Sequence, residues 1–89
     1  MSNQKADRML TNIFARDGVA IDVSAADSTP REGRPVYLYV GTGGDVKVLT
    51  DENATLTFKN IIGGTFLPVL VKTIYNADTT ASDMIACWG

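Results

Sequence analysis

From residue 18 onward, apolar side chains recur at every second position. The segments with this pattern are 19–23, 35–40, 46–48, 55–59 and 66–75, and residues 84–88 form a further short segment that is apolar throughout. Successive side chains of a strand point to opposite faces, so this period predicts short β-strands. Turn residues separate the segments at intervals of about ten residues, which is typical of a β-sandwich or a small barrel. We therefore predict an all-β fold, a small β-sandwich or barrel-like domain of about five to seven short antiparallel strands.

Glycine, proline and polar residues predict how these strands connect. The Gly-Gly pair in residues 42–45 is typical of a tight hairpin, and residues 51–53 (Asp-Glu-Asn) predict the next turn. Residues 66–75 form the longest predicted strand, and Pro68 places its start at an edge or a bulge because proline cannot donate to a strand ladder. Residues 84–88 predict a closing strand that tucks Trp88 against the domain.

The segment 35–40 has large apolar or aromatic side chains on both of its faces. Val36, Leu38 and Val40 share one face of the predicted strand. Tyr37 and Tyr39 share the other face. A strand with two such faces is expected to be covered on both sides, either by a second sheet or by a partner subunit.

The first part of the chain has a different pattern, so we divide the chain into an N-terminal arm or short helix, residues 1–16, and a β-domain, residues 17–89. The i,i+4 apolar pairs of the arm are Met9 with Ile13 and Leu10 with Phe14. A helix this short is marginal in water by itself. The arm therefore either docks its apolar patch on a neighbouring molecule, or forms a lead-in strand or a helix that caps the domain's own core.

Few cross-links are available to stabilise a domain of this size. A chain of 89 residues buries only about 60–65% of the surface that it exposes when unfolded. Cys87 is the single cysteine and there is no histidine, so an intrachain disulfide and a zinc or iron–sulfur site are excluded. Contacts with other chains remain as the means of stabilisation, and the sequence therefore predicts a homo-oligomer.

Composition also argues against several classes of function. The formal charge of −2 does not suit nucleic-acid binding, and no apolar segment approaches the about 20 residues of a membrane span. Without histidine there is no candidate triad or acid–base residue, so we predict no enzyme activity, no catalytic residues, no metal and no cofactor. Asp45, Asp51 and Glu52 are interpreted as solvated turn acids rather than calcium ligands. The N-terminus lacks the apolar core of a secretory signal, so we expect synthesis in a reducing cytoplasm.

Two features leave alternatives open. Cys87 is either a small buried apolar residue or the site of an intersubunit disulfide, since a lone thiol can pair only between chains. Tyr37, Tyr39 and Trp88 are either core and subunit contacts or an aromatic platform for a sugar. We favour burial for the thiol and subunit contact for the aromatic residues.

Several motifs in order resemble one known family. They are LYVGTGGDV at 38–46, FKN at 58–60, GTFLPV at 64–69, TTA at 79–81 and IACW at 85–88. This pattern is similar to the spike-base proteins of tailed phages and of phage-like gene transfer agents, and it covers residues 36–88. The resemblance implies a small β-domain on the capsid exterior that holds a host-binding fibre at a vertex. Residues 1–17 depart from the family's pattern, and Cys87 stands where the family more often has a small aliphatic residue.

Residues and resemblance together predict a virion structural protein on the capsid exterior, made in the cytoplasm of a bacterial host. It would decorate the capsid or form a head-spike base, as a homo-oligomer (a trimer or pentamer) bound to the major capsid protein and to a spike fibre protein. The predicted interface residues are Met9, Leu10, Ile13, Phe14, Tyr37, Tyr39, Phe66 and Trp88, with Cys87 as the candidate intersubunit disulfide. The alternatives are a collar or tail-fibre adaptor and a carbohydrate-binding module that contacts host polysaccharide.

Overall fold

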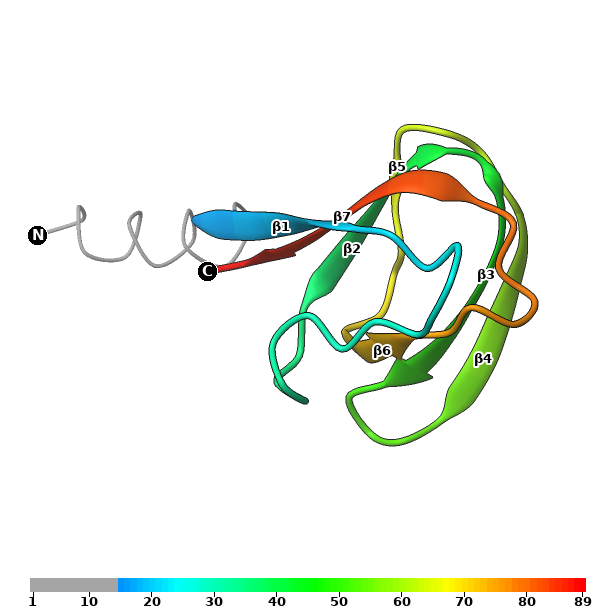
Figure 1. Ribbon diagram of the computed structural model, residues 1–89. Coiled ribbons are helices and arrows are strands. Elements are labelled where there is room, and N and C mark those ends of the chain that lie inside the picture. The colour runs from blue at the N-terminus through cyan, green and yellow to red at the C-terminus, as the bar shows by residue number, and fades with distance from the viewer. Residues whose placement is uncertain (1–14) are drawn as a thin grey trace, which may run out of the picture.

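A computed structural model describes residues 15–89 and confirms the all-β prediction. Its strands are β1 (Asp17–Ile21), β2 (Tyr37–Thr42), β3 (Gly44–Thr50), β4 (Thr55–Ile61), β5 (Thr65–Phe66), β6 (Val71–Ile74) and β7 (Ser82–Trp88). They form a four-stranded sheet in the order β1-β7-β2-β5 and a three-stranded sheet in the order β4-β3-β6 (Figure 1). All strand pairs are antiparallel. The predicted arm patch (Met9, Leu10, Ile13 and Phe14) lies outside the described residues.

The core lies between the two sheets and is made of the inward-facing half of each alternating segment. Its buried apolar residues are Ile21, Val23, Val36, Leu38, Val40, Val46, Val48, Leu67, Val71, Ile74, Ala81, Met84 and Ala86. Val36, Leu38 and Val40 are buried together, as their spacing predicts. At positions 46 and 48, valines of β3 contribute the same alternation from the other sheet. Most of these side chains are β-branched or aliphatic and suit a pleated, closely packed surface.

The predicted Gly-Gly hairpin is wrong, because β2 and β3 belong to different sheets and do not pair with each other. The chain instead passes from one layer to the other at this point. A Cβ at Gly43 would lie 2.3 Å from the carbonyl oxygen of Ile61, and one at Gly44 would lie 2.8 Å from the backbone nitrogen of Ala81. The glycines are therefore required by the close approach of other backbone segments at this corner.

The other predicted turn is confirmed as the hairpin between β3 and β4. The N–H of Thr50 donates to the carbonyl of Ala54 at 2.8 Å, and the N–H of Asn53 donates to the carbonyl of Thr50 at 2.9 Å. Asn53 has a φ of 67°, a left-handed conformation that asparagine tolerates better than most residues. Leu49 and Thr55 are paired next to this turn.

The long strand predicted over 66–75 is also wrong, because it is two strands in two sheets. β5 ends at Phe66 and pairs with β2, whereas β6 begins at Val71 and pairs with β3. Pro68 lies between them and removes a backbone donor where a continuous ladder would need one. Val71 and Ile74 are both buried even though they differ by three positions, so the alternation expected across this segment does not hold.

The predicted closing strand is confirmed, and it lies inside the four-stranded sheet. β7 pairs with β1 on one side, from Asp17↔Trp88 to Ile21↔Met84, and with β2 on the other. Figure 1 shows β1 and the end of β7 running side by side away from the rest of the domain. No helix in residues 15–89 is long and apolar enough to cross a membrane.

Candidate functional site

The outward-facing side chains of the four-stranded sheet are apolar or aromatic. In β2, Leu38 is fully buried while Tyr37 is 39% exposed, and in β7, Ala86 is fully buried while Ile85 is 40% exposed. The two strands therefore turn one apolar set toward the core and a second set toward solvent. Their alternation matches the expectation that the segment 35–40 has two apolar faces. In residues 15–89, the second sheet covers only the inner of those faces.

Strand register brings these outward residues into rows. One row crosses all four strands, because Ala20 pairs with Ile85, Ile85 with Tyr39, and Tyr39 with Phe66. Directly opposed side chains on one face of a sheet lie about 4.5–5.5 Å apart at Cβ, so a row of this kind forms a continuous surface. The next row joins Cys87 to Tyr37. We call the six residues of these rows the outer apolar face: Ala20, Tyr37, Tyr39, Phe66, Ile85 and Cys87.

The aromatic end of the outer apolar face is held in a fixed arrangement. Phe66 is 56% exposed, and its ring contacts the ring of Tyr39 edge-to-face, with centroids 5.3 Å apart and planes at 62°. Such pairs contribute about 0.5–1.5 kcal/mol beyond their buried area. The contact joins β2 to β5, a strand of only two residues. The surface is therefore preorganised rather than a set of independent side chains.

Charged groups lie beside the outer apolar face but not in its two rows. The nearest carboxylate in the β7 sequence is that of Asp83, which accepts a hydrogen bond from the Thr42 hydroxyl at 2.5 Å. Both residues lie at the end of the sheet beyond Tyr39 and Ile85. An apolar centre with a polar margin is the usual composition of a protein–protein contact.

Cys87 is half-buried within this face. Burial raises the pKa of its thiol, because the apolar surroundings disfavour the thiolate. A thiol with a raised pKa is a weak nucleophile at neutral pH. The side chain therefore contributes apolar surface to this face, and both interpretations of Cys87, the buried apolar residue and the intersubunit disulfide, stay predictions.

Trp88, which the sequence grouped with the two tyrosines, lies on the opposite side of the sheet. It follows the inward-facing residues Met84 and Ala86 at the same two-residue spacing and packs against the core. The guanidinium carbon of Arg31 lies 4.9 Å from the centre of a Trp88 ring. Of the four predicted interface aromatics within residues 15–89, the structure thus brings together three, Tyr37, Tyr39 and Phe66.

Two members of the outer apolar face, Ala20 and Ile85, escaped the sequence analysis. The segment 84–88 is apolar at every position, so alternation does not tell which of its residues face outward. The segment 84–88 has apolar residues on both faces, as 35–40 does. A strand of this kind is expected to be covered on both sides, which could have indicated that one of its apolar faces points outward.

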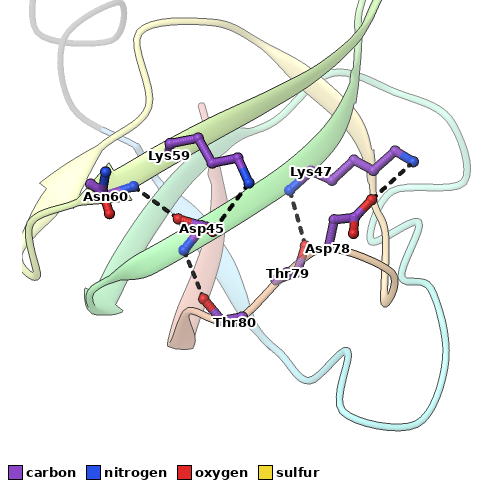
Figure 2. A network of polar contacts seen from close by, with 7 residues as sticks. All are labelled: Asp45, Lys47, Lys59, Asn60, Asp78, Thr79 and Thr80. Atoms are coloured by element: carbon purple, nitrogen blue, oxygen red, sulfur yellow. Dashed lines mark hydrogen bonds and ion pairs between the residues drawn. The ribbon is translucent and has the colours of Figure 1, made fainter.

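A separate polar network lies on the three-stranded sheet and involves a predicted turn acid, Asp45 (Figure 2). Its carboxylate accepts the N–H of Asn60 at 2.9 Å and lies 3.5 Å from the Lys59 ammonium. The hydrogen bond from Asn60 holds the pKa of Asp45 below its usual value. The N–H of Asp45 also donates to the Thr80 hydroxyl at 2.9 Å. Asp45 therefore ties β3 to two other segments and is not a free turn acid.

No group of three or more potential metal-binding side chains occurs in the described part of the chain. A groove of about 690 Å³ lies beside the outer apolar face. Its walls are residues 20–24, Asn76 and residues 79–85. Its polar groups bond within the chain: the Asp22 carboxylate accepts the N–H of Ser24 at 2.9 Å, and the Asn76 amide donates to the Val23 carbonyl. These bonds hold the walls of the groove in place.

Comparison with known proteins adds no relative: no family model, no curated protein and no solved structure matches this chain. The role of the outer apolar face is therefore inferred from its own residues and their arrangement.

Proposed function

We propose that this protein is a structural component of a virus particle that attaches to a larger protein surface through the outer apolar face. The observation that carries the proposal is the outward row across the four-stranded sheet in which exposed Ile85 and Phe66 flank half-buried Tyr39. Exposed, contiguous apolar surface on a small domain is typical of an interaction site. Burying it would contribute about 25 cal/mol per Å² of apolar surface.

The chemistry of the face favours a protein partner. Its two rows contain no lysine or arginine, which phosphate groups of nucleic acid or lipid would require. Its centre is aromatic and rigid, as in the anchors of protein–protein contacts. The partner would therefore present a complementary apolar surface of its own.

The resemblance of residues 36–88 to spike-base proteins supplies the setting. In that setting the partner is the major capsid protein, and the domain lies on the capsid exterior as a decoration protein or as the base of a spike fibre. A capsid repeats the same surface by symmetry, so one small domain gains many equivalent binding sites. A homo-oligomer would present several outer apolar faces to that surface.

Particle incorporation tests the proposal. Cells that carry the gene and release particles would express tagged wild-type protein or the Tyr39→Ser/Phe66→Ser variant, and the particles would be banded on a density gradient. We expect wild-type protein in the particle band and about tenfold less of the variant. The substitutions remove two aromatic rings from the contact and place serine hydroxyls there, which are costly to bury. Leu56→Ser is the matched control, since Leu56 is 41% exposed on the other sheet.

Two results would contradict the proposal. One is wild-type protein that never enters the particle band. The other is a double variant that enters as efficiently as Leu56→Ser while both variants keep the circular dichroism spectrum of the wild type.

A further inference from the structure

The two sheets have four edge strands, which are β1 and β5 in one sheet and β4 and β6 in the other. An edge strand has unpaired backbone groups that can pair with another chain, and proteins usually obstruct such edges. Three of the four edges here are obstructed. Within residues 15–89, nothing obstructs the fourth, β1.

The edges of β5 and β6 are short or already paired. β5 has two residues and is followed closely by Pro68. The far side of β6 is bonded to two other segments: Val71 and Val36 exchange N–H···O bonds of 2.9 and 2.8 Å, and Ile74 and Ser28 exchange bonds of 2.8 and 2.9 Å. Neither edge can accept a further strand.

The edge of β4 is obstructed by its shape and by a charge. Its pairing with β3 shifts between Gly44↔Ile61 and Val46↔Phe58, which marks a β-bulge. Asn60 within the bulge has a φ of 57°, and the preceding Lys59 is exposed. Bulges and lysine residues are two common means of preventing edge-to-edge pairing.

β1 has none of these features. Its register with β7 is uninterrupted over five residues, and the first four of them are exposed. It contains no proline, lysine or arginine. Val19 pairs with Ala86 and so faces the inner side of the sheet, yet it is 43% exposed. Figure 1 shows the β1–β7 ribbon projecting from the rest of the domain.

We propose that β1 pairs antiparallel with β1 of a second copy of this chain, so that two four-stranded sheets become one continuous sheet. This inference rests on the proposed assembly role and names the edge by which copies join. The sequence of β1 is self-complementary. In a pairing centred on Ala20, the half-exposed Val19 lies opposite Ile21 of the second copy, and small Gly18 lies opposite Asp22 of the second copy.

Charge and symmetry favour a second copy as the occupant. Asp17 is the only charged residue of β1, and in this pairing the two Asp17 residues lie at opposite ends, so that like charges do not face each other. A twofold axis perpendicular to the sheet keeps equivalent faces on the same side. The two outer apolar faces then point the same way and can bind one larger surface together, which strengthens attachment without a new contact.

Sedimentation velocity over a range of protein concentrations tests the inference with two matched variants. Val19→Lys and Leu56→Lys each replace an inward-facing edge residue of similar exposure, 43% and 41%. We expect a concentration-dependent dimer for the wild type, a dissociation constant raised about tenfold or more by Val19→Lys, and a change of less than about twofold for Leu56→Lys. Circular dichroism and thermal unfolding would verify that both variants fold.

Hydrogen exchange locates the contact. Amides of β1 should exchange more slowly as the wild-type concentration rises, and Val19→Lys should remove that dependence. A wild type that stays monomeric at every concentration would overturn the inference, as would a Val19→Lys protein that dimerises like the wild type. If dimerisation depends on β1 but the protein never enters particles, the proposed function fails and this inference stands.

Discussion

The outer faces of the two sheets differ although their inner faces are alike. In the four-stranded sheet the central outward row is Ile85, Tyr39 and Phe66. In the three-stranded sheet the corresponding positions are polar or mixed: Lys47 pairs with Thr57, and Leu49 pairs with Thr55 and Thr73. In both sheets, alternation places apolar side chains toward the core. Only in the three-stranded sheet does it also place polar side chains toward solvent in these rows.

The outer face of the three-stranded sheet, which we call the polar face, has partners for its charged side chain Lys47 within the chain. Lys47 lies 3.6 Å from the Asp78 carboxylate and 5.6 Å from the centre of the Tyr75 ring. The backbone N–H of Lys47 donates to the Thr79 hydroxyl at 3.0 Å (Figure 2). An antiparallel sheet with one packed and one solvated face has this composition. By comparison, the outer apolar face has the composition of an inner face, and no second sheet of the described residues covers it.

The largest expected effect separates the two faces of a single strand. Leu38→Ala removes a fully buried side chain and should lower the free energy of unfolding by about 2–5 kcal/mol. Tyr39→Ala, at the next position, should cost less than Leu38→Ala, because Tyr39 is only half-buried and loses the contact with Phe66, about 0.5–1.5 kcal/mol, together with a part of its buried area. Urea unfolding of the monomer measures both. Equal losses would mean that Tyr39 is part of the core, and the comparison between the faces would fail.

A smaller effect concerns the polar face and depends on pH. The pKa of Asp45 is lowered by the hydrogen bond from Asn60, so its ionised form stabilises the fold. That contribution is fully present above the ordinary pKa of 3.8 and is lost as the pH falls through the lowered value. Thermal unfolding between about pH 2 and 7 should show a shallower acid decline for Asp45→Asn than for the wild type. Asp51→Asn is the control, and parallel curves for all three proteins would contradict the role of Asp45.

The smallest expected effect concerns Cys87, on the apolar face. Because burial raises the pKa of this thiol, a disulfide reagent should modify it more slowly at neutral pH than it modifies a free cysteine peptide. The rate should increase as the pH rises toward the raised pKa. Modification as fast as that of the peptide would show that the thiol is solvated, and the apolar character of this part of the face would be in doubt.

Alternation was sufficient to predict most of the strands and of the inner face, but not the division of the segment 66–75 or which strands pair. Val36, Leu38 and Val40 are buried as predicted because a one-residue shift would expose all three. The Gly43–Gly44 pair misled because glycine serves a tight turn and a close backbone approach equally well. A tight turn and a close backbone approach can be told apart only by the atoms next to the glycine. At Gly43 that atom is the carbonyl oxygen of Ile61, which is distant in the sequence.

The candidate face was predictable in part for a related reason. Tyr37, Tyr39 and Phe66 were selected as candidate interface aromatics, and register places them on one surface. Trp88 was selected by the same criterion, but it lies on the inner side of the sheet with Arg31 over its ring. In a segment that is apolar throughout, only the pairing partner determines which side a residue faces. The pairing partner could not be predicted from the sequence pattern.

The central position of β7 also determines the order in which the sheet can be completed. β1 is made early, yet among the described strands it pairs only with β7, which follows more than half a chain length later. Until residues 82–88 are synthesised, no described strand joins β1 to β2, and the edge of β2 on that side stays unpaired. Among the described strands β7 comes last in the sequence, and it therefore completes both pairings in a single step.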